Sequence, residues 1–416
     1  MTAAKELNEA AKEWQLKAGE EFRFEVAFRK TIKVTLVSGC AEYFGAELGP
    51  TTDYSFSGEN GAIFSWEGCT LRVVGECQSA YVAGETPMDS YINVHMALQQ
   101  KRVQAHGDIS GGSDESAATP RETPLFADLD PHEATITVPG TLSVTPITHA
   151  ISIEDSWIGY AEASSNAPPA TPIVWQFGHE QPTDNVLLYK LLVDRVAQSI
   201  DLRLRTDRFA AGSGFVVDTR GVSDASKYEV LEYAAEKLKI NVLIVVGNER
   251  MYSAFSSKMA GVTVVKLAKS GGVVDREPAF RRQYNSRIVR QYFYGTSGNP
   301  VSSYSTITNF DDILVVRIGE DARAPSSTLP LGESRMVTDT SVLEVTPDEG
   351  LSHSILAVTD ARRDEAREGV VGMQALGFVS VTGVDMAKKR LTLLAPVPGR
   401  LQKPVLLYGG IKWMET

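Results

Sequence analysis

The chain has 416 residues, of which 43 % are hydrophobic and 22 % are charged, and its formal net charge is −11. At roughly 100–200 residues per domain, this length predicts two to four domains and excludes a single compact core. The acidic balance excludes a basic footprint over the whole chain, so any nucleic-acid contact must come from a local basic patch. No stretch approaches the ~18–20 apolar residues of a membrane-spanning helix, and we expect no membrane association.

Residues 21–83 alternate apolar and polar side chains with a period of two. Phe22, Phe24 and Val26 share one face, and turn sequences such as Ser57–Gly61 separate the runs. Short alternating runs with regular turn signals predict a small all-β sandwich or barrel. We expect this N-terminal β domain to occupy residues 1–86.

From Pro87 to about Ala105 the apolar period becomes helical. The residues on one side of this predicted helix are Met88, Ile92, Met96 and Val103. The composition then changes sharply, because Gly107–Pro124 holds four acidic residues against one basic residue and very few apolar ones. Such a stretch cannot bury a face, so we predict a disordered linker over residues 107–124.

From Leu125 to Gly295, apolar runs alternate with helical stretches. The runs are Leu125–Leu129, Ile173–Phe177, Phe215–Val217, Val242–Val246 and Val262–Leu267, and the helices are about Asn185–Leu204 and Ala225–Lys239. Continuous apolar strands between amphipathic helices indicate a parallel sheet covered on both faces. We predict an α/β domain over residues 87–300 and, from the short strand-like runs beyond it, a third and mainly β domain over residues 301–416.

Several strings of the chain occur in an order that matches a known family. They are Glu21–Val26, Phe64–Cys69, Asp128–Pro131 with Val138–Thr141, Gly247–Tyr252, Lys269–Val274, and Arg287 and Arg290 before Tyr292–Gly295. Together they resemble the Clp family of eukaryotic pre-mRNA cleavage and polyadenylation factors, in its fungal type, a branch of the polynucleotide 5′-hydroxyl kinases. The resemblance covers nearly the whole chain, and the combined strings are far more specific than any one of them.

The resemblance implies an α/β fold whose central, P-loop-NTPase-like parallel sheet is flanked by an N-terminal β-sandwich and a C-terminal, mainly β domain. It also implies a nuclear subunit of the pre-mRNA 3′-end cleavage machinery. The expected partners are the large scaffold subunit that contacts the RNA polymerase II tail and other 3′-end processing subunits, with pre-mRNA contacted indirectly.

The phosphate-binding loop of such kinases, G-x-x-x-x-G-K-[ST], is missing, because the sequence contains no Gly-Lys dipeptide. The acidic segment 107–124 stands where the resemblance places that loop. We therefore expect a scaffold that is required for endonucleolytic cleavage before poly(A) addition and is not an enzyme. The alternative is an ATP-dependent polynucleotide 5′-hydroxyl kinase, or a stably ATP-bound structural factor, whose P-loop is missing from this sequence. Ser270–Gly272 is interpreted as a tight turn in preference to a substitute phosphate loop.

The resemblance also assigns candidate site residues. Glu21 and Asn60 would meet the nucleotide, although a strand-edge charge and a turn residue are the plainer interpretations. Asp130 would hold Mg²⁺ at the carboxyl end of a strand, against the alternative of an aspartate that starts a loop before Pro131. Arg287 and Arg290 would contact phosphate or RNA, against the alternative of a solvated helix face. ATP and Mg²⁺ are implied only by the resemblance, and we expect their binding to be weak or absent.

Overall fold

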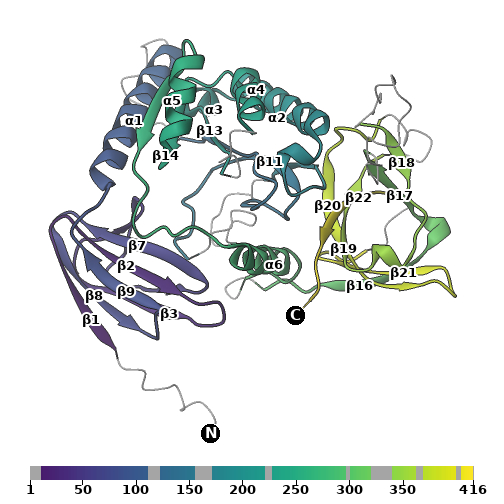
Figure 1. Ribbon diagram of the computed structural model, residues 1–416, viewed down its shortest axis with the longest axis horizontal. Helices are drawn as coiled ribbons and strands as arrows, with labels where there is room; N and C mark the ends of the chain where they lie inside the picture. The colour runs from purple at the N-terminus through teal and green to yellow at the C-terminus, as the bar shows by residue number, and fades with distance from the viewer. Residues whose placement is uncertain are drawn as a thin grey trace, which may run out of the picture. The chain divides into compact units, whose positions relative to one another are not determined.

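The computed structural model describes residues 11–110, 122–154, 171–220, 227–296, 300–319, 340–361, 369–399 and 404–415. They divide into two compact units. The first comprises residues 1–104, 151–156 and 241–284, and the second comprises residues 105–150, 157–240 and 285–416. Helices α1 (Met88–Ser110) and α6 (Pro278–Tyr294) each contribute residues to both units (Figure 1).

The first unit contains a sandwich of two antiparallel sheets, with strand orders β1-β8-β3-β6 and β5-β4-β7-β2-β9. The strands are β1 (Lys12–Lys17), β2 (Glu20–Val26), β3 (Ile32–Gly39), β4 (Glu42–Tyr43), β5 (Ala46–Glu47), β6 (Asp53–Phe56), β7 (Glu59–Ser65), β8 (Gly68–Val74) and β9 (Ser79–Ala83). The predicted alternation is confirmed on β2, where Phe22, Phe24 and Val26 are at most 1 % exposed. Successive strand residues point to opposite faces, so Glu21 and Arg23 lie on the face away from this core.

Helix α1 departs from its prediction in two ways. It extends to Ser110, so the first four residues of the predicted linker are helical, and residues 111–121 lie outside the described part of the chain. Its predicted apolar side is not buried beyond Met88, because Met96 is 54 % and Val103 is 60 % exposed. Helical spacing alone does not supply a surface for such a stripe to pack against. Among the described helices, none is long and apolar enough to cross a membrane.

The first unit also holds a parallel pair of strands, β14 (Val242–Val246) and β15 (Thr263–Leu267), with helix α5 (Glu249–Lys258) between them. The sequence VLIVV predicts a strand covered on both faces. In the structure only Val245 is buried, whereas Ile244 is 39 % and Val246 is 50 % exposed. Among the described strands, β14 pairs with β15 alone.

The α/β part of the second unit has a four-stranded sheet with the order β12-β11-β10-β13. Its strands are β10 (Leu125–Asp128), β11 (Thr141–Pro146), β12 (Ile173–Gln176) and β13 (Phe215–Asp218), and its helices are η1 (Pro182–Asp184), α2 (Val186–Thr206), α3 (Arg208–Ser213) and α4 (Tyr228–Leu238). β10 and β13 run parallel, whereas β11, which the sequence interpretation missed, is antiparallel to β10 and β12.

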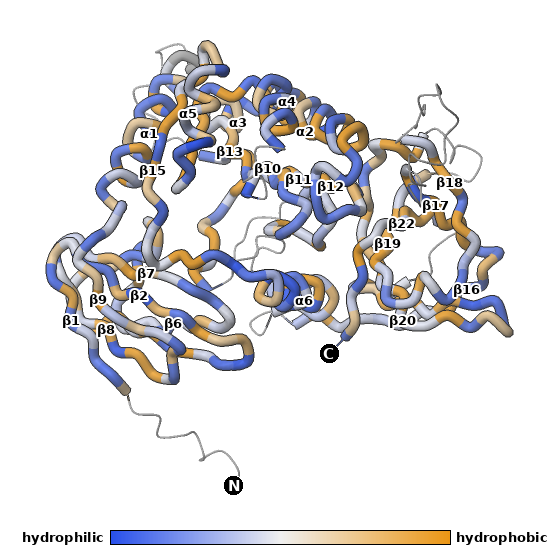
Figure 2. The backbone as a smooth tube through the Cα atoms, in the orientation of Figure 1, coloured by the Kyte–Doolittle hydropathy of each residue, from blue (hydrophilic) through white to orange (hydrophobic). Residues whose placement is uncertain are grey.

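Helices α2 and α4 lie within the two ranges that the sequence predicts as helical, about Asn185–Leu204 and Ala225–Lys239, to within two residues at the end of α2. Asn185 caps α2 by accepting a hydrogen bond from the backbone N–H of Leu188 at 3.0 Å. On α4, apolar residues with helical spacing are buried: Leu231, Ala234, Ala235 and Leu238. Hydrophobic residues recur along both helices in Figure 2.

The C-terminal part of the second unit is a seven-stranded sheet with the order β16-β21-β20-β19-β22-β17-β18. Its strands are β16 (Tyr304–Asn309), β17 (Leu314–Ile318), β18 (Val342–Glu344), β19 (Ser354–Thr359), β20 (Ala375–Asp385), β21 (Arg390–Ala395) and β22 (Val405–Lys412), with short helices η3 (Phe310–Asp312) and η5 (Glu349–Leu351). Its core includes Leu356, Val381 and Leu406, each fully buried. The predicted α/β fold with a β-sandwich before it and a mainly β domain after it is confirmed.

We predict that Phe24→Ala lowers the free energy of unfolding of the N-terminal sandwich by about 3–5 kcal/mol, because it removes a buried ring from a closely packed core. Val37→Ala on β3 is the matched control, since Val37 is 45 % exposed and its loss should cost less than about 0.5 kcal/mol. Thermal unfolding of both full-length variants measures the difference. Equal shifts in the two variants would contradict the assigned core.

Candidate functional site

Three aspartates gather at one edge of the β10–β13 pair, and we call Asp128, Asp130 and Asp218 the acidic edge. Asp128 and Asp218 end their strands and lie opposite one another in the parallel register. Parallel strands place their carboxyl ends at the same edge of a sheet, which is where α/β proteins hold ligands. Asp128 and Asp130 are each 2 % exposed. The structure thus gathers two carboxylates that the sequence interpretation did not single out around the predicted Asp130.

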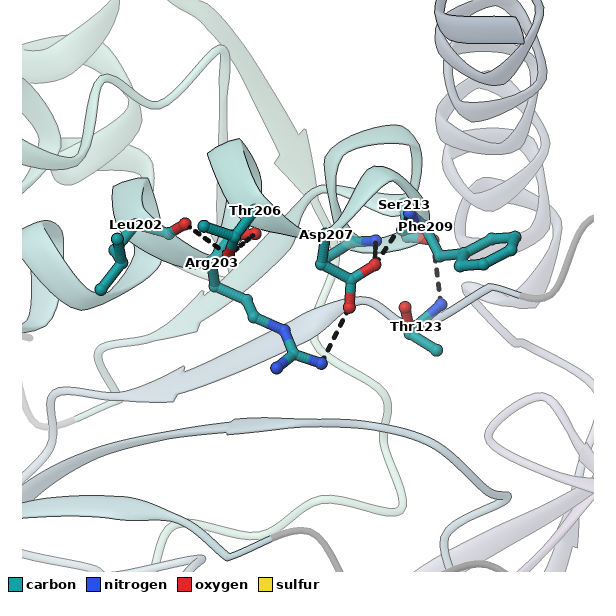
Figure 3. A network of polar contacts seen from close by, with 8 residues as sticks. Thr123, Leu202, Arg203, Thr206, Asp207, Phe209 and Ser213 are labelled. Atoms are coloured by element: carbon teal, nitrogen blue, oxygen red, sulfur yellow. Dashed lines mark hydrogen bonds and ion pairs between the residues drawn. The ribbon is translucent and has the colours of Figure 1, made fainter.

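The start of β10 is anchored by the end of α3, which sets this register. The backbone N–H of Thr123 donates to Ser213 Oγ at 2.9 Å, and that hydroxyl donates to the carbonyl of Phe209 at 2.8 Å (Figure 3). The N–H of Leu125 donates to the carbonyl of Gly214 at 3.0 Å. β13 begins at the next residue, so both strands start side by side and their final aspartates meet.

Backbone N–H groups and one arginine stabilise the buried carboxylates. Asp128 accepts hydrogen bonds from the N–H groups of Asp130 and Thr135, at 3.0 and 2.8 Å. Arg220 Nε lies 2.7 Å from Asp218 Oδ2, and its guanidinium also donates to the side chain of Thr135. Arg220 therefore ties the end of β13 to the loop that follows β10, a link between segments far apart in the sequence.

The single guanidinium does not balance the carboxylates around it. Burial raises the pKa of Asp128 to about 7, and the neighbouring Asp218 carboxylate raises it too, against the opposing effect of Arg220. Burial likewise raises the pKa of Asp130, against the N–H of His132, which donates to it at 3.0 Å. Three carboxyl groups thus share one guanidinium, and a bound cation would favour their ionised forms.

The carboxylates of the acidic edge fit an Mg²⁺ ion that takes its other ligands from water and from a bound phosphate group. Among the described residues no group of three or more His, Cys, Asp or Glu side chains is arranged to hold a metal. Mg²⁺, however, is usually bound through one or two carboxylates together with water and substrate phosphates. Asp130 Oδ1 accepts from His132, whereas Oδ2 has no hydrogen bond to a described residue. Asp130 is thus the carboxylate best placed to take such an ion.

The two predicted lid arginines lie three residues apart on α6. Arg290 is 3.8 Å from Glu415 Oε1, and its guanidinium lies 5.3 Å from the centre of the Tyr294 ring. Its side chain is 57 % exposed, so this ion pair contributes little to stability. Arg287 is half-buried. Asn285 of α6 reaches the loop after β10, because its Nδ2 donates to the carbonyl of His132 at 2.8 Å.

Glu21 and Asn60 do not converge in the structure. Glu21 lies opposite Phe64 and Asn60 lies opposite Glu25, an offset of four residues along β2, or roughly 13 Å. The carboxylate of Glu21 is 1 % exposed and is 2.9 Å from Arg23 Nε. It also accepts a hydrogen bond from the hydroxyl of Thr86. The predicted strand-edge charge is therefore a buried, fully engaged ion pair.

Ser270–Gly272 forms the predicted tight turn, in which the N–H of Val273 donates to the carbonyl of Ser270 at 3.1 Å. The turn lies against the outer face of β2 and β7. A Cβ at Gly271 would collide with the guanidinium of Arg23, and one at Gly272 would collide with Ala62. Gly272 is the position that requires glycine, because it lies against the backbone of Gly61 as well as Ala62, whereas the guanidinium of Arg23 can move away from a Cβ at Gly271.

Three family models match the chain one after another. Residues 15–105 match the N-terminal beta-sandwich domain of polyadenylation factor. Residues 115–295 match the P-loop domain of mRNA cleavage and polyadenylation factor CLP1, and residues 301–415 match pre-mRNA cleavage complex II protein Clp1.

Full-length relatives agree with these matches. The mRNA cleavage and polyadenylation factor clp1 of Botryotinia fuckeliana is 32 % identical over 433 aligned positions, which cover 97 % of this chain and 93 % of the relative. The polyribonucleotide 5′-hydroxyl-kinase Clp1 of Xenopus laevis is also 32 % identical. Its alignment covers 97 % of this chain and 94 % of the length of the relative. The prediction that the chain is not an enzyme is wrong, because relatives this similar over nearly their whole length are named as kinases.

Two solved structures share the fold, each with a TM-score of 0.80 and 22 % identity over 98 % of this chain. One is described as wild-type Clp1p in complex with a segment of Pcf11p, and matches over 99 % of that chain. The other, matched over 100 % of its chain, is described as an extended interface between Pcf11p and Clp1p with the structural basis for ATP loss in a point mutant. From the three consecutive family matches and the full-length relatives, this chain belongs to the Clp1 family of mRNA cleavage and polyadenylation factors.

Proposed function

We infer that this chain acts in the cleavage of pre-mRNA 3′ ends that precedes poly(A) addition. The observation that carries this inference is the match of the whole chain, in domain order, to a family of cleavage and polyadenylation factors. Such a role needs no single reacting site, since a subunit contributes by holding others in place. We propose that it acts in the nucleus, where pre-mRNA is processed.

The proposed partner is a subunit like Pcf11p, because Clp1p is described in complex with it in both matching structures. We extend this to a large scaffold subunit that contacts the RNA polymerase II tail, with pre-mRNA approached through the assembly. The net charge of −11 supports indirect RNA contact, since it disfavours binding of RNA along the whole chain.

At the acidic edge we propose that Asp130 binds Mg²⁺ through Oδ2, with Asp128 and Asp218 supplying negative potential behind it. Bound there, Mg²⁺ would neutralise charge on a phosphate group of a nucleotide such as ATP. The Gly-Lys pair that normally completes a triphosphate cradle is absent from the sequence. The residues of the chain therefore fit the metal better than they fit the triphosphate.

Polynucleotide 5′-hydroxyl kinase activity is the second candidate function. It is named for the vertebrate relatives, and the observation that favours it here is the acidic edge. Buried carboxylates with raised pKa values at the carboxyl end of parallel strands are typical of sites for charged ligands. Arg287 and Arg290 are the proposed contacts for RNA phosphates.

An extract from cells depleted of this chain should no longer cleave a synthetic pre-mRNA. Adding the purified chain to that extract should restore cleavage. Asp130→Asn should restore it equally, because the scaffold role does not use the carboxylate. The measurement is the fraction of pre-mRNA cut at the poly(A) site. An extract that keeps full cleavage after depletion would contradict the inferred role.

The kinase candidate is tested by transfer of labelled phosphate from ATP to an RNA with a 5′-hydroxyl end. We expect labelling by the wild type and a loss of at least about 100-fold in Asp130→Asn, because the metal would lose its ligand. Asp201→Asn is the matched control, since Asp201 pairs with Arg205 on the exposed surface of α2 and belongs neither to the acidic edge nor to the proposed RNA contacts. Absence of labelling by the wild type would remove this candidate and leave the processing role untouched.

The raised pKa of Asp128 predicts how stability changes with pH. Between about pH 4, near the ordinary pKa of aspartate, and the folded pKa of about 7, the folded state binds more protons than the unfolded state. The free energy of unfolding therefore falls as the pH rises through this window and levels off above it. Mg²⁺, which favours the ionised carboxylates, should stabilise the chain more at alkaline than at acidic pH.

Thermal unfolding of the wild type and of Asp128→Asn, compared across this pH range, measures the effect. The unfolding temperature of the wild type, relative to that of Asp128→Asn, should fall as the pH rises from about 4 to about 7. The variant lacks this dependence because its amide does not titrate. A difference that stays constant would contradict the raised pKa.

A further inference from the structure

His132 lies directly after Asp130 and Pro131, and its backbone is held at both polar atoms. Its N–H donates to Asp130 Oδ1 at 3.0 Å. Its carbonyl accepts a hydrogen bond from Asn285 Nδ2 at 2.8 Å. The backbone of His132 is therefore fixed next to Asp130 by two neighbours, one on its own loop and one on α6.

The ring of His132 has a third anchor, built from Gln181 and Lys227. Lys227 Nζ lies 2.5 Å from Gln181 Oε1, and the amide nitrogen of Gln181 lies 3.2 Å from His132 Nδ1. An ammonium group can only donate, so the oxygen of the amide must be the atom that faces Lys227. The amide NH₂ then faces His132, and Nδ1 must accept its hydrogen bond.

This chain of hydrogen bonds decides which nitrogen of the imidazole carries the proton. A neutral imidazole has one donor and one acceptor nitrogen. Because Nδ1 accepts, Nε2 carries the hydrogen and is a donor. Nε2 makes no hydrogen bond to a described residue and is not among the buried unsatisfied atoms. His132 therefore offers an accessible N–H of fixed tautomer next to Asp130.

We propose that His132 is a ligand-binding residue whose Nε2–H, held in this tautomer by Lys227 and Gln181, donates to a phosphoryl oxygen bound at the acidic edge. The inference rests on the proposed binding of Mg²⁺ and a phosphate group at Asp130. The inference adds to that site a specific hydrogen-bond donor, His132 Nε2–H, and the two residues that orient it, Gln181 and Lys227.

The neighbouring charges select a phosphoryl group accompanied by a cation. A bare phosphate would be repelled by Asp128, Asp130 and Asp218, so it must arrive with a metal that binds Asp130. A phosphoryl oxygen only accepts hydrogen bonds and so complements an N–H donor. The group could belong to a nucleoside triphosphate or to the end of an RNA, and the two sources are separated by the binding measurements.

The tautomer is tested first, without any ligand, by ¹⁵N NMR of the full chain labelled at histidine, with His132→Gln used to assign the signal. At about pH 8, where an ordinary histidine is neutral, we expect the pattern of an Nε2–H imidazole. Gln181→Glu should reverse it, because a carboxylate at this position accepts from Nδ1–H. An Nδ1–H tautomer in the wild type would overturn the proposal whatever the fate of the processing role.

The ligand is tested by calorimetry with ATP and Mg²⁺, and separately with a short 5′-phosphorylated RNA and Mg²⁺. His132→Leu should weaken binding of one of these ligands about tenfold, as expected for one hydrogen bond to a charged group. His132→Gln should retain most of the affinity, because its amide nitrogen reaches the position of Nε2. His149→Leu, which changes another half-buried histidine, should bind as the wild type does.

Each outcome of the binding experiment has a definite meaning. An effect of His132→Leu confined to ATP assigns the phosphoryl group to a nucleotide, and an effect confined to RNA assigns it to the RNA end. Equal affinity of His132→Leu and the wild type overturns the proposal. So does the absence of saturable binding of either ligand by the folded wild type, a result that leaves the role in 3′-end cleavage intact.

Discussion

The parallel pairing of β10 with β13 is the constraint on which the candidate site depends. It places Asp128 beside Asp218 at the end of two short strands. Two neighbouring carboxylates of like charge are costly to bury. Arg220 stabilises Asp218 through an ion pair, and the backbone N–H groups of Asp130 and Thr135 stabilise Asp128 through hydrogen bonds. The loop after β10 is buried along most of its length because it must curl over these carboxylates to reach them.

The same requirement connects the site to helices far along the chain. Tyr189 of α2 donates its hydroxyl to the carbonyl of Leu129 at 2.8 Å, and Asn285 of α6 donates to that of His132. These contacts satisfy backbone groups that the curled loop could not pair within itself. A site held from α2, α6 and β13 is more rigid than one carried on the loop alone, which suits the fixed positions of Asp130 and His132.

The N-terminal sandwich uses its polar outer face in another way. Glu21, Arg23 and Thr86 form a closed set of contacts, and the turn at Ser270 lies over it. Glu21 thus holds Arg23, whose guanidinium lies against Gly271 of the turn. Asn60, four residues away along the strand pair, is outside this set.

Strand β14 has an apolar sequence but remains half-exposed, and β13 pairs with β10 alone among the described strands. The alignment with the Botryotinia relative spans 433 positions, more than the 416 residues of this chain, so that relative has residues within the aligned region that this chain lacks. Exposed apolar strand surface costs about 25 cal/mol per Å² relative to burial. Within the described part of the chain, β14 thus keeps an apolar composition while part of its surface stays exposed.

Local sequence patterns determined the element types and their order. The two-residue period of β2, the helices α2 and α4 and the run Val242–Val246 each appear where the pattern predicts, because such periods depend on a few neighbouring residues. Asp130 could also be predicted from the sequence, because it is an acidic residue that follows an apolar strand. Tertiary structure alone decided the rest. The pairing of Asp128 with Asp218, the link from Lys227 through Gln181 to His132, and the exposure of α1 all depend on which distant segments meet, and hydrogen bonds between residues more than forty positions apart leave no local periodicity to detect.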